Sequence, residues 1–80
     1  MRTAASSELV AFGRTVRKAR RDRDLSQEAL ADEAGLSAKH IGEIERANKD
    51  PRLTTVLKIA KALDLRSGEL LSELDERLDG

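Results

Sequence analysis

The feature that most constrains this chain of 80 residues is a very short junction between two short helical segments. Ser26 and Ser37 are of a residue type that favours the N-cap of a helix, and each precedes a helix-forming segment of about eight to ten residues. Only three residues, Gly35 to Ser37, separate the segments, and Gly35 supplies the positive φ that ends a helix in a tight turn. So short a connection cannot lay two helices antiparallel along their lengths. We therefore expect the pair to cross steeply.

The rest of the chain also has the composition of helices. It contains one Phe, one Pro and neither Trp nor Tyr, and no stretch alternates between apolar and polar residues as a strand does. Apolar residues at spacings of three and four predict a first helix from about Ser7, a fourth over residues 53–63 and a fifth that Ser67 caps. The sequence therefore predicts an all-α domain of five helices. We expect this domain to span residues 7–78, after a flexible tail of residues 1–6.

The composition disfavours several kinds of site and location. The chain has no Cys, so neither disulfides nor thiolate metal sites are available. Its longest apolar run, Leu9 to Phe12, is far below the ~20 residues of a membrane span, and its first residues lack the apolar segment of a secretion signal. It has no Gly-rich phosphate loop and no cluster of metal ligands, and His40 is its only His. We expect a cytoplasmic protein that is not an enzyme, binds no metal or cofactor and has no membrane partner.

The charge is unevenly distributed along the chain, although the formal net charge is zero. Between Arg14 and Arg23 there are six cations and one anion, whereas residues 53–80 hold four cations and six anions. A protein can bind a polyanion with one face while its total charge is zero. The basic run therefore indicates a candidate surface for nucleic acid. The alternative interpretation is a solvated helix face without a partner.

The segment around the junction, "SQEALADEAGLSAKHIGEIERANKDP", resembles the helix-turn-helix of the phage repressor and Cro superfamily, also called the xenobiotic-response-element family. The resemblance extends over "RTVRKARRDRDLSQEALA" before the junction and "RLTTVLKIAKALDL" after it. The size of the chain is also similar to that of stand-alone controller proteins of restriction–modification systems, and equally to that of small phage repressors. The motif residues are Gln27, Leu30, Ala31, Gly35, Ile41, Ile44 and Glu45.

This resemblance implies a lambda-repressor-like fold with the helix-turn-helix at residues 26–46. It also implies a function, which is sequence-specific regulation of transcription by a protein that binds double-stranded DNA. In such proteins a homodimer binds a palindromic operator, and each recognition helix, here residues 38–46, enters the major groove. An alternative of a different class is an antitoxin or adaptor of the same fold, whose partner would be a toxin or another protein.

The third helix has an outer face that suits a DNA groove. Ile41 and Ile44 are expected to hold this helix on the body of the domain, so the 3.6-residue period turns residues 38, 39, 42 and 43 outward. The major groove is about 12 Å wide and admits one helix. By resemblance, base contact is carried onto Lys39, which can donate to guanine, Glu43, which can accept from cytosine, and Ala38, which can touch a thymine methyl. Alternatively, Lys39 and Glu43 form a surface ion pair.

Contacts to phosphate are expected on either side of this helix. The start of the second helix presents unpaired N–H groups, and Gln27 at that position hydrogen-bonds a phosphate by resemblance. Arg52 is a further candidate, with the minor groove as an alternative target. A lone His such as His40 is more often a surface or packing residue. The complete set of candidate phosphate contacts is Gln27, Ser37, His40, Arg46, Lys49 and Arg52.

Two positions in this region depart from simple expectations. Gly42 costs roughly 1 kcal/mol against Ala in a helix interior. It either clears space for a base or phosphate, or occupies a tolerant surface position. The family usually has Gly just after the third helix, where this chain has Ala47. We expect Asn48 to adopt the left-handed conformation there, because Asn tolerates it.

Two further expectations concern structural roles. By resemblance, Arg20 and Glu45 form a buried ion pair between the first and third helices, although Arg20 could instead face phosphate with the other cations of its run. Leu74 and Leu78 in the fifth helix are expected to form a twofold dimer interface. Alternatively, these leucines fold onto the core of their own monomer.

Overall fold

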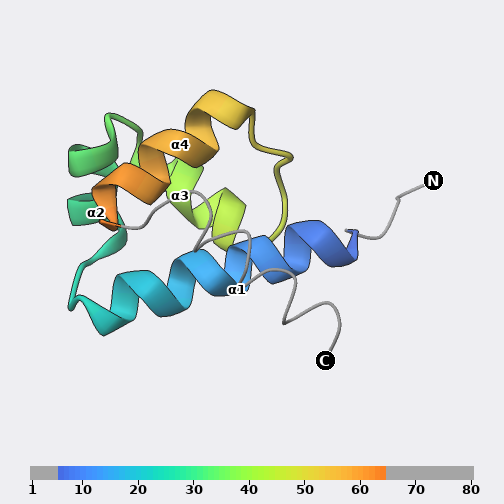
Figure 1. Ribbon diagram of the computed structural model, residues 1–80, viewed down its shortest axis with the longest axis horizontal. Coiled ribbons are helices and arrows are strands. Elements are labelled where there is room, and N and C mark those ends of the chain that lie inside the picture. Colours follow the sequence, from blue (N-terminus) through green and yellow to red (C-terminus); the bar gives the residue numbers. More distant parts are fainter. Residues whose placement is uncertain (1–5, 65–80) are drawn as a thin grey trace.

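The computed structural model describes residues 6–64, which contain four α-helices and no strand. The helices are α1 (Ser7–Asp22), α2 (Gln27–Ala34), α3 (Ala38–Glu45) and α4 (Leu53–Ala62), as Figure 1 shows. The predicted all-helical class is therefore confirmed. The predicted fifth helix lies outside the described residues, and so do Leu74 and Leu78.

Serine side chains cap the first three helices. Each Ser Oγ accepts a hydrogen bond from the backbone N–H three residues later, which satisfies one of the N–H groups that a helix start leaves unpaired. α4 begins after Arg52, which makes no such side-chain bond. The three caps are Ser6 with Leu9 at 3.1 Å, Ser26 with Ala29 at 3.0 Å and Ser37 with His40 at 3.0 Å.

The junction between α2 and α3 has the tight geometry that the sequence predicts. Gly35 has φ 68°, in the left-handed region where a side chain would be strained. The N–H of Leu36 then reaches back to the carbonyl oxygen of Ala31 at 2.8 Å, so the chain reverses within one turn. Ala31 is only 2% exposed, and its small side chain lets α3 pack closely on α2.

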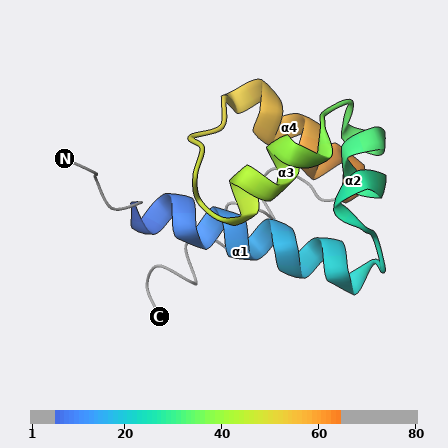
Figure 2. The same cartoon turned by 180° about the vertical axis from the view of Figure 1, so that it is seen from behind.

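The helices enclose one small apolar core. α1 extends along the molecule, α2 lies at one end, and α3 packs against both α1 and α2, whereas α4 packs against α2 (Figures 1 and 2). All four helices contribute buried side chains, and this packing supplies most of the stability that such short helices lack on their own. The core residues are Phe12, Val16, Ala19, Leu30, Ala31, Ile41, Ile44, Ile59, Ala60 and Leu63.

The end of α3 differs from the sequence-based expectation. Ala47, not Asn48, adopts the left-handed conformation, with φ 60°. The N–H of Asn48 bonds the carbonyl oxygen of Glu43 at 2.8 Å, and the N–H of Ala47 bonds that of Ile44 at 3.1 Å. These two bonds form a Schellman motif, which requires the left-handed residue directly after the C-cap. The hydrogen-bond pattern of the helix end therefore outweighs the cost of about 1–2 kcal/mol for a non-glycine residue.

A second unpredicted feature is the close approach of α1 and α3 at Gly13. A Cβ atom at Gly13 would lie 2.6 Å from the carbonyl oxygen of Ile44 and 2.7 Å from that of Glu45. Both atoms belong to backbone, which cannot rotate away as a side chain can. The absence of a side chain at Gly13 therefore sets the distance between α1 and the last turn of α3.

Within residues 6–64, no helix is long and apolar enough to cross a membrane.

Candidate nucleic-acid interface

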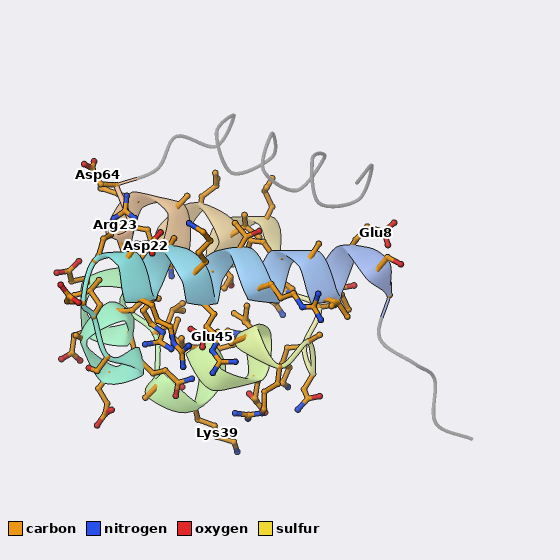
Figure 3. All side chains as sticks on the ribbon, turned by 90° about the horizontal axis from the view of Figure 1, so that it is seen from below. Glu8, Asp22, Arg23, Lys39, Glu45 and Asp64 are labelled. Carbon is orange, nitrogen blue, oxygen red and sulfur yellow. The ribbon has the colours of Figure 1, made fainter. Side chains whose placement is uncertain are left out.

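α3 has one face in the core and one that projects from the domain. Ile41 and Ile44 are 0% and 1% exposed, so they anchor the helix as the sequence predicts. Lys39 is exposed, and Figure 3 shows its side chain pointing away from the other helices. The anchored face and the projecting face follow directly from the 3.6-residue period.

Lys39 and Glu43 do not form a surface ion pair, which was the alternative to base contact that their spacing of four residues allowed. No ion pair joins them among residues 6–64, and Glu43 is half-buried whereas Lys39 is exposed. Their spacing of four places both on the projecting side of α3. Their charged groups therefore remain available to an external partner.

Ala38 is less exposed than the outward-facing prediction implies. It is half-buried and packs against the apolar core. The reason is its position three residues before Ile41, which brings the two side chains to neighbouring parts of one face. Only part of its methyl group is accessible from outside the domain.

Gly42 is buried, which corrects the prediction that it points outward. A Cβ atom there would lie 3.0 Å from Nη1 of Arg46 and 3.6 Å from both Nε2 and Oε1 of Gln27. The packing of α2 on α3 brings Gln27 over the α3 backbone at this point. Gly42 is therefore covered by two polar side chains of the same molecule, and it is not an open surface position.

A buried ion pair connects α1 to the end of α3. Arg20 donates from Nε to Oε2 of Glu45 at 2.6 Å and from Nη2 to Oε1 at 3.1 Å. Its Nη1 also donates to the carbonyl oxygen of Leu25 at 2.8 Å. The Arg20 and Glu45 side chains are 11% and 4% exposed, and Figure 3 shows Glu45 between α1 and α3. Arg20 is thus engaged inside the protein and does not project with the other cations of its run.

The electrostatics of this pair favour its charged form. The hydrogen bonds that Arg20 donates to Glu45 raise the pKa of Arg20 above its ordinary value, against an opposing effect of burial. A cation whose pKa is higher in the folded state than in the unfolded state stabilises the fold as long as it stays charged. This stabilisation is lost only when the pH rises through the raised pKa. For an arginine this occurs only in strongly alkaline solution. The ion pair therefore holds the end of α3 in place at neutral pH.

Gln27 extends the ion pair to α2. Its Nε2 donates to Oε1 of Glu45 at 3.2 Å, so one carboxylate receives hydrogen bonds from both α1 and α2. An amide nitrogen carries two hydrogens, and Glu45 accepts one of them. The second hydrogen of Gln27 and the N–H groups at the start of α2 remain suited to an anion.

The remaining candidate residues lie on α3, at its two caps or in the loop that follows it. Ser37, Arg46, Lys49 and Arg52 are exposed, and His40 is half-exposed. On α1, Arg14, Arg17, Lys18 and Arg21 share the face opposite the core, where Lys18 also pairs with Asp22 at 2.8 Å. Among residues 6–64, no group of three or more His, Cys, Asp or Glu side chains is placed to hold a metal ion.

Comparisons with known proteins give one family. The sequence profile of the helix-turn-helix family matches residues 16–70. The crystal structure of the restriction–modification controller protein C.AhdI from Aeromonas hydrophila has 40% sequence identity and a TM-score of 0.78, and the match covers 81% of this chain and 98% of that chain. The control protein C.SmaI of Serratia marcescens is 40% identical over 57 residues, which are 71% of this chain and 68% of that protein.

A longer relative matches this chain over only a small share of its own length. The HTH-type transcriptional regulator y4dL of Sinorhizobium fredii is 40% identical over 50 residues, which are 62% of this chain. These residues are only 26% of that protein, so the chain spans about a quarter of this relative.

Proposed function

Because the chain belongs to the helix-turn-helix family of transcriptional regulators, we propose that it binds double-stranded DNA sequence-specifically, as a homodimer on a palindromic operator. The proposal assigns α3 and its C-cap, residues 38–46, to the major groove. The single observation that supports it best is the geometry of α3. This helix combines a fully buried apolar footing, an ion pair at its end and a projecting polar face.

We assign direct base readout to Lys39, Glu43 and the accessible part of Ala38. Lys39 donates to the O6 and N7 atoms of guanine, and Glu43 accepts from the N4 amine of cytosine. The ion pair between Arg20 and Glu45 supports this assignment, because it holds α3 rigidly on α1. A helix held rigidly presents its side chains to the bases without a further entropic cost of ordering.

We assign the phosphate contacts to groups that donate hydrogen bonds or carry positive charge. Gln27 retains one amide hydrogen, and Ser37 retains its hydroxyl hydrogen after its oxygen has accepted from His40. Contacts of this kind position the recognition helix but carry no sequence information. The assigned residues are Gln27, Ser37, His40, Arg46, Lys49 and Arg52.

Exposed apolar surface supports the homodimer. Leu53 and Leu57, four residues apart on α4, are 72% and 44% exposed. One helix-turn-helix domain reads one half-site, so a palindromic site requires two copies. The proposed interface joins these leucines to Leu74 and Leu78. A cytoplasmic location and a toxin partner stay predictions.

Selection from random duplex DNA tests the function. The purified protein is incubated with the duplex pool at moderate salt, and bound duplexes are sequenced over several rounds. We expect an enriched palindrome whose half-site centres are about 10 base pairs apart, or a multiple of that spacing. Binding that is weak, sensitive to salt and without an enriched sequence would refute sequence-specific regulation.

A matched pair of variants controls for charge in the same selection. Lys39→Ala removes one positive charge from α3, and Lys58→Ala removes one from an exposed position on α4. We expect the first to change the enriched sequence at one base pair and the second to leave it unchanged. Equal effects of the two variants would mean that α3 does not read the bases.

A further inference from the structure

We propose that Gly42 is a positioning residue, because its missing side chain lets the guanidinium of Arg46 lie across the α3 backbone where it contacts the phosphate of bound DNA. This inference rests on the proposed DNA-binding function and adds a residue that acts through another. It replaces both sequence-based interpretations of Gly42, which were direct clearance for DNA and a tolerant surface position.

The geometry of three side chains supports the inference. A Cβ atom at Gly42 would lie 3.0 Å from Nη1 of Arg46, which is closer than carbon and nitrogen normally approach, and 3.6 Å from the amide atoms of Gln27. Gln27 is held at this place by its hydrogen bond to Glu45 at 3.2 Å. The side-chain amide of Gln27 therefore lies on one side of the space above Gly42. The guanidinium of Arg46 occupies the rest of that space.

The chemistry of Arg46 explains why its position matters. The side chain is exposed, and no hydrogen bond or ion pair holds its guanidinium among residues 6–64. Its Nη1 lies directly over the α3 backbone at Gly42, and this packing limits its orientation. A guanidinium that is oriented before binding loses less conformational freedom when it forms hydrogen bonds with a phosphate. A side chain at residue 42 would displace it from this orientation.

The variant Gly42→Ala separates this role from a structural one. Ala is a better helix former than Gly, and the atom that its Cβ meets is the far end of an exposed side chain that can move. We expect the melting temperature to stay unchanged or rise by up to about 8 °C. We expect affinity for the selected operator to fall roughly 3- to 10-fold, because a charge-assisted phosphate contact is weakened. A loss of affinity together with a loss of stability would assign Gly42 a purely structural role and overturn the proposal.

A double-mutant cycle with Arg46→Ala tests whether Gly42 acts through Arg46. If it does, Gly42→Ala changes affinity by less than about 2-fold once Arg46 is already Ala, since the two substitutions then remove the same contact. An equal loss in both backgrounds would mean that the new methyl group meets DNA directly. Unchanged affinity of Gly42→Ala in the native background would mean that Gly42 positions nothing. Each of these two results overturns the proposal.

A measurement without DNA keeps the inference separate from the proposed function. If the native protein enriches no sequence, the function fails, but the orientation of Arg46 can still be observed by NMR. We expect Gly42→Ala to shift the Nε–Hε resonance of Arg46 strongly and the side-chain amide resonances of Gln27 weakly, in line with the distances of 3.0 and 3.6 Å. An unmoved Arg46 resonance would overturn the inference on its own.

Discussion

Gly13→Ala should destabilise the protein, although the same change in most helices stabilises it. Gly13 lies in the interior of α1, where Ala is normally favoured by about 1 kcal/mol because Gly has more conformational freedom to lose. Here the added Cβ would lie 2.6 and 2.7 Å from the carbonyl oxygens of Ile44 and Glu45. An ordinary contact begins near 3.4 Å, so α1 and α3 must separate by several tenths of an ångström.

The magnitude follows from two opposing contributions. Overpacking the contact between α1 and α3 costs about 1–3 kcal/mol. The separation of the two helices also moves Glu45 away from Arg20, and the energy of their buried ion pair depends strongly on its geometry. The gain in helix propensity offsets about 1 kcal/mol of this cost. We expect a net loss of roughly 1–2 kcal/mol in the free energy of unfolding, which lowers the melting temperature by about 4–8 °C per kcal/mol.

Urea denaturation followed by circular dichroism measures this loss. Gly42→Ala is the matched control, because it makes the same substitution in the interior of another helix, where the new Cβ meets a movable side chain and no backbone atom of another helix. We expect the urea midpoint to fall for Gly13→Ala and to stay or rise for Gly42→Ala, with similar m-values. A Gly13→Ala protein as stable as the native one would show that α1 and α3 do not approach as closely as described.

Four further substitutions test the ion pair, the two kinds of proposed DNA contact and the proposed dimer. Glu45→Ala should lower the free energy of unfolding by about 3–5 kcal/mol in urea denaturation, since it leaves the buried charge of Arg20 unpaired; a loss below 1 kcal/mol would contradict this. Lys39→Ala should relax preference at one base pair and cost about 1–3 kcal/mol there, measured with operator variants, whereas an even loss over all sequences would make it a phosphate contact. Arg52→Ala should weaken binding to all sequences and reduce the slope of log affinity against log salt by about 1, and an unchanged slope would remove it from the interface. Leu74→Glu should give a folded monomer by analytical ultracentrifugation, and a native protein that is already monomeric at high concentration would contradict the proposed interface.

Much of the fold could be predicted from local patterns. The caps at Ser26 and Ser37 and the turn at Gly35 depend on interactions within one or two turns of chain, so short segments of sequence are sufficient to find them. The inward faces of the helices follow from apolar spacing, because burial depends on the helical period. The family was recognisable because these local signals occur together over the same segment.

Local patterns failed where two elements meet. Gly42 was expected to face outward from its spacing on α3, yet Gln27 comes from α2 and covers it. Gly13 received no assignment, although a glycine inside an amphipathic helix indicates a cost that packing must offset. At the end of α3, Ala47 adopts a conformation that residue preference assigns to Asn48, because the hydrogen bonds of the helix end fix which residue must be left-handed.

The sequence by itself therefore determined the four helices within residues 6–64, the caps at Ser26 and Ser37, the turn between α2 and α3 and the outward position of Lys39. Only the tertiary structure decided how closely α1 approaches α3, that one carboxylate of Glu45 receives hydrogen bonds from both Arg20 and Gln27, and what covers Gly42. The physical reason is the range of the forces involved. Helix propensity and capping act within a few residues of the chain, whereas close packing and buried ion pairs depend on distances between elements that no local pattern encodes.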